Sequence, residues 1–391
     1  MSALNVRMVP ISLLGEVLLG KMVQPSRKNE TDELRPYLRA AHLPAPGTLS
    51  LDVSEQQMYF SPHEIDRLDL RKSDVVIVEG GAGYGRSAYL DNDLGGWGFQ
   101  NSIVRVRAYP GVSVGKYVYY ALQHAQLDRQ IELEVSTATL PHFTAEKVGR
   151  FRIPLPPLTT QRAIADYLDR ETSEIDAMTA DLDKVEALLT ERRVAYIGRA
   201  VRTISGPSKR VRLQSIARIH AGETITAADI EDDGLFAVYG GNGVRGYADR
   251  ANEEHDRVLV GRQGALCGNV HLARGPFFAS EHALVGEPHI DVDLEWLALV
   301  LSDQNLGQLS MSAAQPGITA MGVGLQKIDM PGMDEQRRIA AQMDRETAEI
   351  DAMLADITEL RDLLAERRAA LIAAAVTGQI NIQTAEEPTH A

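Results

Sequence analysis

The chain has 391 residues, of which 44% are hydrophobic and 24% charged, and its formal net charge is −14 at pH 7. This length predicts two or three domains, and no apolar run reaches the roughly 18 residues that a membrane span requires. The acidic balance argues against a chain that grips a polyanion by itself, and the single cysteine, Cys267, excludes a disulfide framework and a cysteine-based metal cluster.

Residues 1–152 form the first predicted globular domain, with 17 acidic and 17 basic side chains. Its N-terminal residues lack the apolar centre and cleavage site of a signal peptide, so we expect a cytoplasmic protein. Residues 73–79 (SDVVIVE) and 101–107 (NSIVRVR) are predicted strands, and the second alternates apolar and basic residues. A helix is expected over 114–126.

The remainder of the chain repeats this order. A proline-rich hinge opens a predicted long helix over 153–202, and a second globular domain of net charge about −5 follows over 203–327. Its strand-like runs surround glycine-rich turns, and residues 294–301 are predicted to be helical. A second long helix is expected over 328–380, and 381–391 form an acidic tail.

The two long helices are copies of one another. Residues 161–201 and 336–376 align without a gap at an offset of 175, with 24 of 41 positions identical. Such a repeat should be recognised before a fold is assigned. Both copies carry apolar residues at alternating spacings of three and four, which is the heptad pattern of a coiled coil. Seven of these positions fall in each copy: Leu168, Ile175, Met178, Leu182, Val185, Leu189 and Tyr196, and Met343, Ile350, Met353, Ile357, Leu360, Leu364 and Leu371.

Matched apolar seams of equal length favour mutual pairing over two separate amphipathic helices. Each helix would be about 60 Å long. Since the second globular domain lies between the helices in the sequence, an antiparallel pair is the simplest arrangement. We therefore predict an α+β protein in which two α/β domains are joined by a long antiparallel two-helix coiled coil, with pseudo-two-fold symmetry from the repeat.

Catalytic motifs are not recognisable in the sequence. It contains neither G-x-x-x-x-G-K-[ST] nor an Asn-Pro-Pro-Tyr/Phe run. Ser280, Glu281 and His282 are triad residue types, but neighbours on a strand point to opposite faces. The histidines lack metal-ligand spacing, and Cys267 is expected to be a small buried apolar residue. We therefore predict no catalytic residues and no metal site.

The globular domains instead offer polar loops between predicted strands. Arginine pairs bidentately with guanine, and asparagine or glutamine with adenine. On this chemistry we select as DNA-binding candidates Tyr84, Arg86, Asn101 and Arg105 in the first domain, and Asn242, Arg245, Tyr247, Arg262 and Gln263 in the second. Each could also be an ordinary turn or surface residue.

The arrangement resembles the specificity subunit of a type I restriction-modification system, in which two target-recognition domains alternate with two similar spacer helices. The repeats IPLPPLTTQRAIADYLDRETSEIDAM and MPGMDEQRRIAAQMDRETAEIDAM carry the resemblance. The runs FAVYGGNGVRGY, VLVGRQGALCGNVH and ASEHALV resemble one class of recognition domain, and DVVIVEGGAGYGRSAY with FQNSIVRVR another. Thr160 departs from the family, which usually has Glu there, as at Glu335.

The resemblance implies a non-catalytic subunit of a type I site-specific deoxyribonuclease and adenine-N6 methyltransferase complex. Each domain would read half of a bipartite target in double-stranded DNA, while the coiled coil sets the gap. Its partners would be two modification subunits and the restriction subunits. S-adenosylmethionine, ATP and Mg²⁺ would be bound by those partners and no cofactor by this chain. We expect the modification subunits to dock around the DRET segments, on Arg170, Glu171, Glu174, Arg345, Glu346 and Glu349.

Two other functional classes remain open at this point. One is a non-catalytic scaffold that binds proteins through its two globular domains, which the acidic charge favours. The other is a self-sufficient enzyme, which the missing motifs disfavour. A scaffold would show no salt-dependent DNA binding even with partner subunits present.

Overall fold

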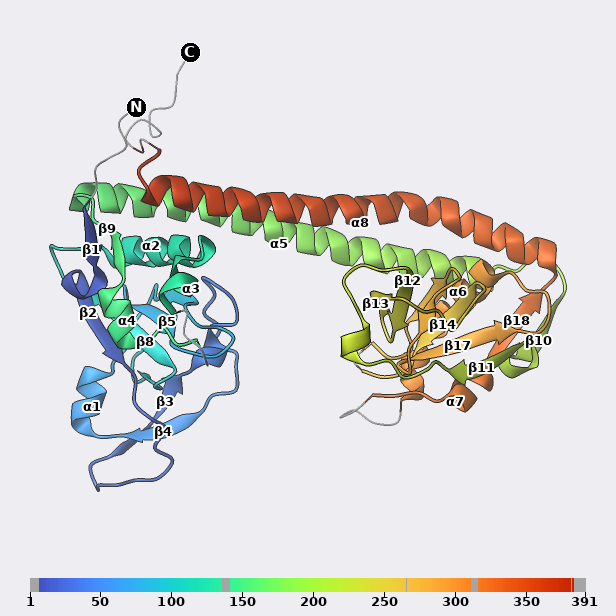
Figure 1. Cartoon of the computed structure of the whole chain (residues 1–391), viewed down its shortest axis with the longest axis horizontal. Helices are drawn as coiled ribbons and strands as arrows, with labels where there is room; N and C mark the ends of the chain where they lie inside the picture. The colour runs from blue at the N-terminus through green and yellow to red at the C-terminus, as the bar shows by residue number, and fades with distance from the viewer. Residues whose placement is uncertain (1–6, 136–140, 265, 311–315, 381, 383–391) are drawn as a thin grey trace, which may run out of the picture. The chain divides into compact units, whose positions relative to one another are not determined.

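The computed structural model describes residues 7–135, 141–264, 266–310, 316–380 and 382 (Figure 1). The chain divides into two compact units, Met1–Asp181 with Leu360–Ala391, and Leu182–Glu359. Each unit contains one globular domain and parts of the two long helices, α5 (Leu158–Arg202) and α8 (Met333–Val376). Among the described residues no helix is both long and apolar enough to cross a membrane. The predicted tail lies, apart from Ile382, outside the described residues.

In its described residues, the first globular domain contains three small sheets. A two-stranded sheet pairs β1 (Met8–Pro10) with β9 (Arg152–Pro154). A four-stranded sheet has the order β2 (Gly15–Leu19), β8 (Ile103–Ala108), β5 (Val75–Val78) and β6 (Ser87–Tyr89). A three-stranded sheet has the order β4 (Gln57–Phe60), β3 (Glu33–Leu38) and β7 (Gly98–Phe99). The helices are α1 (Pro62–Arg67), α2 (Gly115–Leu127), α3 (Gln130–Val135) and α4 (Ala145–Arg150), with short 3₁₀ turns at Ile11–Leu13 and Ala40–His42.

The apolar run of β5 is explained by burial on both of its faces. Val75 and Ile77 pack in the core that includes α2, whereas Val76 and Val78 pack in a second core with the three-stranded sheet. Successive side chains of a strand alternate between faces, so a strand covered on both sides needs a continuous apolar run. The predicted strands over 73–79 and 101–107 and the predicted helix over 114–126 are confirmed.

The second globular domain contains the corresponding sheets. A two-stranded sheet pairs β10 (Ser208–Arg212) with β18 (Lys327–Pro331). A four-stranded sheet has the order β11 (Ala217–Ala221), β17 (Ala283–Pro288), β14 (Arg257–Gly261) and β15 (Val270–Ala273). A three-stranded sheet has the order β13 (Gly243–Ala248), β12 (Phe236–Gly240) and β16 (Phe278–Ala279). The helices are α6 (Leu294–Asp303) and α7 (Ala320–Gly324), with 3₁₀ turns at Leu213–Ser215, Ala227–Asp229 and Leu306–Leu309.

The two globular domains therefore share one topology. The four-stranded orders β2-β8-β5-β6 and β11-β17-β14-β15 match strand for strand, and so do the two-stranded and three-stranded sheets. The parallel pair β3–β7 corresponds to the parallel pair β12–β16. The internal repeat thus includes the globular domains, although their sequences resemble different classes.

Within each unit the long helices pair antiparallel, as predicted. In the first unit, Leu168 near the start of α5 shares a core with Ile372 and Val376 at the end of α8. In the second unit, Ile197 near the end of α5 shares a core with Ile339 at the start of α8. Ion pairs join Asp176 to Arg368 in the first unit and Arg193 to Asp351, at 2.9 Å, in the second.

The predicted seam is only half correct. One column of each heptad is buried or partly buried, and comprises Ile175, Leu182 and Leu189 of α5 and Ile350, Ile357 and Leu364 of α8. The other predicted column, Met178, Val185, Met353 and Leu360, is close to half exposed at every position. Of the two predicted columns only the first faces the partner helix, and Met178 and its equivalents lie at the flank of the pair. The facing surface is completed by a column that was not predicted, which includes the partly buried Thr179 and Leu354.

Candidate nucleic-acid interface

The turn between β12 and β13 forms one wall of a pocket of about 460 Å³ in the second unit. The pocket is lined by Gly240, Gly241, Asn242, Gly243, Val244, Arg245, Gln263, Leu266 and His282. Three of the five residues predicted to read bases in this domain, Asn242, Arg245 and Gln263, therefore lie together. We call this site the hairpin pocket.

Glycine residues bring the two sides of the hairpin pocket together. Gly240 pairs with Gly243 across a two-residue turn, and Gly243 has a φ of 87°. A Cβ atom on Gly261 would lie only 2.0 Å from the carbonyl oxygen of Gly241, so the turn can rest on the end of β14 only if position 261 is glycine. This close approach places Asn242 at the tip of the hairpin, on the same pocket as Gln263.

The two amides of the hairpin pocket are held by neighbouring side chains. Asn269 donates from Nδ2 to Oδ1 of Asn242 at 2.8 Å. Nδ1 of His282 lies 3.1 Å from Oε1 of Gln263. His282 was not among the predicted DNA-binding residues, because we considered it only as a catalytic or zinc residue. The sequence feature that could have indicated His282 is its position immediately before the apolar strand β17, because side chains at the end of a strand lie next to the neighbouring loops.

The electrostatics of the hairpin pocket differ from those of the acidic pocket that Tyr247 lines in the same unit. Its lining residues, all within the described part of the chain, include an arginine and no carboxylate. A second pocket, of about 470 Å³, is lined by four carboxylates, Asp229, Glu231, Asp233 and Asp249, and one cation, Arg250. A pocket lined by an arginine and no acid suits the edge of a polyanion better than the acidic pocket does.

Tyr247 and Arg262 are not brought to the hairpin pocket. Tyr247 lines the acidic pocket, and its main chain pairs with Glu231 through two hydrogen bonds of 2.9 Å. Arg262 lies beside the hairpin pocket but is half-buried, and its Nη1 donates to the carbonyl oxygen of Glu281 at 3.3 Å. The structure therefore separates these two candidates from Asn242, Arg245 and Gln263.

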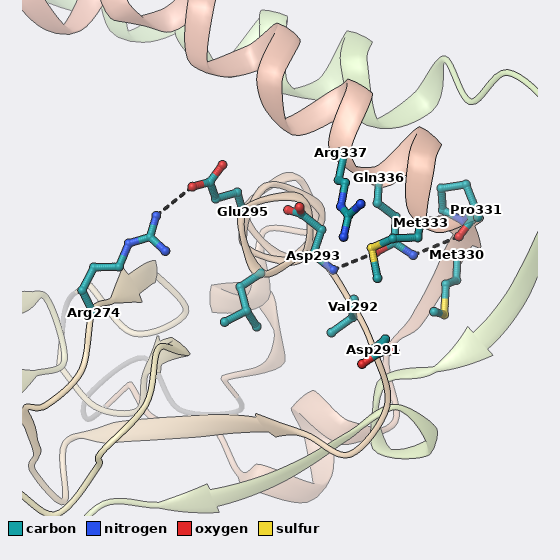
Figure 2. Close-up of a pocket in the computed structure, with 12 residues that line it drawn as sticks. Arg274, Asp291, Val292, Asp293, Glu295, Met330, Pro331, Met333, Gln336 and Arg337 are labelled. Carbon is teal, nitrogen blue, oxygen red and sulfur yellow. Dashed lines mark hydrogen bonds and ion pairs between the residues drawn. The ribbon is translucent and has the colours of Figure 1, made fainter.

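Another pocket of the second unit, of about 750 Å³, lies where α6 and α8 begin (Figure 2). Its lining mixes charges, and Arg274 forms an ion pair of 2.7 Å with Glu295. Oε1 of Gln336 accepts from the backbone N–H of Asp293 at 2.9 Å, and its Nε2 donates to the carbonyl oxygen of Pro331 at 2.9 Å. These bonds attach the first turn of α8 to the start of α6, so we interpret this region as a structural joint.

The Ser280–Glu281–His282 run does not form a catalytic relay. Ser280 is fully buried, and its Oγ accepts the backbone N–H of His282 at 3.4 Å. Glu281 Oε1 does lie 3.4 Å from His282 Nε2, but the ring's other nitrogen faces Gln263. Cys267 is buried as a free thiol. Among the described residues, no group of three or more histidine, cysteine, aspartate or glutamate side chains is placed to hold a metal ion.

In the first unit, three of the four DNA-binding candidates are partly accessible. Arg86 donates from Nη1 to the carbonyl oxygen of Pro44 at 2.8 Å. Tyr84 packs against the core from the loop after β5, and Asn101 lies in the turn that enters β8. In the shared topology β8 corresponds to β17. Asn101 therefore occupies the position that Glu281 has in the second domain, which is one residue before the position equivalent to His282.

Arg105 does not fit its predicted role. Its side chain is only 1% exposed, forms ion pairs with Glu16 and, at 3.2 Å, with Asp69, and lies over the Phe99 ring. The alternating pattern of β8 suggested that its basic face is solvent-exposed. The three-stranded sheet covers that face, so the guanidinium is a buried structural group and is not available to a base.

The DRET segments are residues 169–172 of α5 and 344–347 of α8, and their side chains lie on different faces of the helices. In the first unit, the Tyr120 hydroxyl donates to Oδ1 of Asp169 at 2.7 Å and lies 3.2 Å from Oγ1 of Thr172, so these two residues face the globular domain. Burial raises the pKa of Tyr120. Glu171 instead faces α8, with Arg367 at 3.7 Å.

The remaining predicted docking residues are exposed. Arg170 and Glu174 are exposed on α5, and Arg345, Glu346 and Glu349 are exposed on α8. Arg170 lies over the ring of Tyr167. Only Glu171, of the six, is engaged between the helices, which leaves five residues open to a partner.

The comparisons with known proteins agree on one family. The family model described as "Type I restriction modification DNA specificity domain" matches residues 14–187 and 206–360. The Escherichia coli protein named type I restriction enzyme EcoprrI specificity subunit is 35% identical over 156 residues, which cover 39% of this chain and 38% of that protein. The E. coli EcoBI specificity subunit is 31% identical over 71 residues, or 18% of this chain and 15% of that protein. The chain thus aligns with well under half of each relative's length.

A solved structure extends the likeness to the whole fold. A chain from a study of complex assembly and conformational transition of the type I R-M system has a TM-score of 0.62 and 17% identity, and covers 97% of this chain and 100% of its own length. At this identity the match supports the fold, including the paired long helices.

Proposed function

Because the chain belongs to the type I restriction-modification DNA specificity family, we propose that it is the subunit that selects the DNA sequence for a type I restriction-modification complex. Each globular domain reads one half of a bipartite duplex target, and the coiled coil sets the gap between the halves. One observation carries the proposal: the family model matches twice, and the two matched stretches fold with the same strand order. Two equivalent domains suit two half-sites.

The chain contributes sequence selection rather than chemistry. Its net charge of −14 disfavours a strong phosphate grip by the chain alone. In this proposal, two modification subunits supply the phosphate contacts and the adenine-N6 methylation, and restriction subunits cut the DNA. S-adenosylmethionine, ATP and Mg²⁺ belong to those partners, and the complex works in the cytoplasm.

Two exposed apolar patches on the coiled coil support docking of two partner subunits. In the first unit the patch comprises Met178, Leu360 and Leu363, and in the second unit Met353, Val185 and Leu188. The internal repeat relates the two patches residue by residue at an offset of 175. We call them the flank patches. Two equivalent patches match a stoichiometry of two modification subunits, which we propose as their occupants.

The flank patch of the first unit lies away from the globular side of α5. Thr172 of α5 contacts Tyr120 of the globular domain. Successive residues of an α-helix are rotated by about 100°, so Met178 lies about 240° around the helix axis from Thr172. This places Met178 beyond the column that includes Ile175 and faces α8. A partner on this flank would leave the globular domain free for DNA. The exposed charged residues Arg170 and Glu174 form a second candidate docking surface on α5.

The test is a comparison of adenine methylation in cells that have the modification subunits with and without this chain. We expect methylation at a bipartite sequence only when the chain is present, and we expect the purified chain alone neither to methylate nor to cut DNA. A complex that assembles but shows no salt-dependent DNA binding would instead support the protein-binding scaffold. Turnover by the purified chain, abolished by a substitution within it, would show that it is an enzyme.

A further inference from the structure

We propose that the hairpin pocket recognises a guanine by its major-groove edge. This inference rests on the proposed function and adds the class of base that one pocket reads. A guanine presents two hydrogen-bond acceptors in the major groove, N7 and O6, whereas adenine presents an acceptor beside a donor. The arrangement of donors and acceptors in the pocket distinguishes these two cases.

The amides of the pocket are oriented to act as donors. To read adenine, an asparagine or glutamine must turn both its oxygen and its nitrogen towards the base. Here the oxygen of Asn242 is turned towards Nδ2 of Asn269, and the oxygen of Gln263 towards Nδ1 of His282. Among the described residues, no acceptor forms a hydrogen bond with their –NH₂ groups. Both amides thus offer N–H groups, which suit acceptors on a base.

Arg245 supplies the strongest donor. Its side chain is exposed and forms no ion pair within the described part of the chain. A Cβ atom on Gly240 would lie 3.1 Å from Cδ of Arg245, so the aliphatic stem lies across the glycine and projects the guanidinium from the hairpin. The planar fork of an arginine matches O6 and N7 of guanine bidentately.

Other bases fit the pocket less well. Cytosine presents the N4 amino donor, which a carboxylate reads, and the lining contains no carboxylate. Thymine is the strongest rival, because its methyl group could contact the half-exposed Val244 and Leu266 at the rim. Thymine, however, offers a single acceptor, O4, to three groups that donate.

The experiment uses the complete complex of this chain with its modification subunits. The bases required for methylation are mapped on a library of randomised duplexes with the wild-type chain, Arg245→Ala and Arg245→Lys. We expect Arg245→Ala to lose the preference for one guanine in one half-site by about 5- to 150-fold, which corresponds to a bidentate contact. Arg245→Lys should keep part of it, because lysine also donates to O6 and N7. Arg250→Ala, in the acidic pocket, is the matched control and should change no base preference.

A second measurement keeps the side chain and changes the base. Replacing that guanine by 7-deazaguanine removes the N7 acceptor and should lower methylation by the wild-type complex, but not by the Arg245→Ala complex. If Arg245→Ala keeps every base preference, or relaxes an adenine, thymine or cytosine instead, the guanine assignment is wrong while the proposed function stands. If the wild-type complex shows no sequence preference that depends on this chain, the proposed function fails and the inference with it.

Discussion

Gln161 and Gln336 make the same two hydrogen bonds at equivalent places in the two units. Each is 1% exposed. Oε1 of Gln161 accepts the backbone N–H of Val114 at 3.0 Å, and its Nε2 donates to the carbonyl oxygen of Pro156 at 2.9 Å. Gln336 repeats both bonds, with the backbone of Asp293 and of Pro331, at 2.9 Å each. One buried side chain thus joins each long helix to the globular domain before it.

The first prediction is that Gln161→Met and Gln336→Met each destabilise the protein. Methionine keeps the volume of the side chain, but leaves a buried backbone N–H and a buried carbonyl oxygen without partners. Each unsatisfied group costs about 1–3 kcal/mol, so each variant should lose several kcal/mol of unfolding free energy in denaturant titrations. Gln308→Ala is the control, because Gln308 donates to the carbonyl oxygen of Gln304 on the surface. Equal stability of all three variants would show that the two bonds contribute nothing.

The second prediction concerns Arg105, which the structure assigns to stability. Arg105→Ala should lower the unfolding free energy by about 3 kcal/mol, because it removes a buried guanidinium that donates to the carbonyl oxygens of Arg67 and Asp69 and leaves a cavity beside the Phe99 ring. Arg71→Ala is the matched control. Arg71 also pairs with Asp69, but its side chain is 61% exposed, and an exposed pair contributes less than about 1 kcal/mol. A folded Arg105→Ala complex that loses one base preference at unchanged stability would restore its predicted role in DNA binding.

The long helices could be predicted from the sequence because the signal is local. Heptad spacing and the ungapped repeat require no knowledge of distant contacts, and chain order then favours an antiparallel pair. Which heptad column is buried depends on the partner helix, so Met178 and Val185 were placed wrongly in the seam. The common topology of the globular domains was also invisible, because strand order arises from non-local pairing that sequences of different classes do not reveal.

The same distinction explains the candidate site. Asn242 and Arg245 could be predicted because a glycine-rich turn between strands is a local signal. Arg105 could not be assigned correctly, since burial of its face depends on a separate sheet. His282 was missed because its role follows from a long-range contact with Gln263. Local patterns therefore located the loop, and tertiary packing decided which side chains it presents.

The third prediction is a pH dependence at the start of α8. Glu335 accepts from Arg338 at 2.7 and 2.8 Å and from the backbone N–H of Ser205 at 2.7 Å, and these bonds lower the pKa of Glu335 to about 2. A lowered pKa means that the contribution to stability is present above the ordinary value of 4.5 and is lost as the pH falls towards about 2.

Glu335→Thr, which copies Thr160 of the first repeat, removes this carboxylate. Its melting temperature should lie below that of the wild-type chain at pH 7, and the difference should shrink between pH 4.5 and pH 3. The effect should be small because Arg338, the ion-pair partner of Glu335, is half-exposed. A difference between the two melting temperatures that stays constant over this range would mean that Glu335 stabilises the helix start without its charge.

The fourth prediction separates the two proposed docking surfaces. Leu363→Asp and Leu188→Asp place a charge in one flank patch each, and should each reduce the number of bound modification subunits from two to one. The double variant should bind none, as native mass spectrometry would show. Both positions are exposed, so the chain itself should stay folded, and Leu133→Asp on the exposed side of α3 is the control. If the charge-reversing pair Arg170→Glu and Glu174→Arg abolishes assembly while the flank variants do not, the partner docks on the DRET segments.

The last prediction tests the coiled coil as the element that sets the gap between half-sites. Leu182 and Ile357 pack in one cluster on opposite helices, so one heptad inserted after each preserves the buried columns. Each helix becomes about 10 Å longer. With base pairs about 3.4 Å apart, the gap in the methylated target should grow by about three base pairs.

The half-site sequences should not change, because both globular domains are untouched. Sequencing of adenine methylation in cells that carry the lengthened chain and its modification subunit measures gap and half-sites together. A control chain with a heptad in α5 alone shifts every facing pair on one side of the insertion, and should lose activity rather than change the gap. An active lengthened chain that still methylates at the original spacing would show that the DNA or the partner subunits, and not the coiled coil, determine the gap.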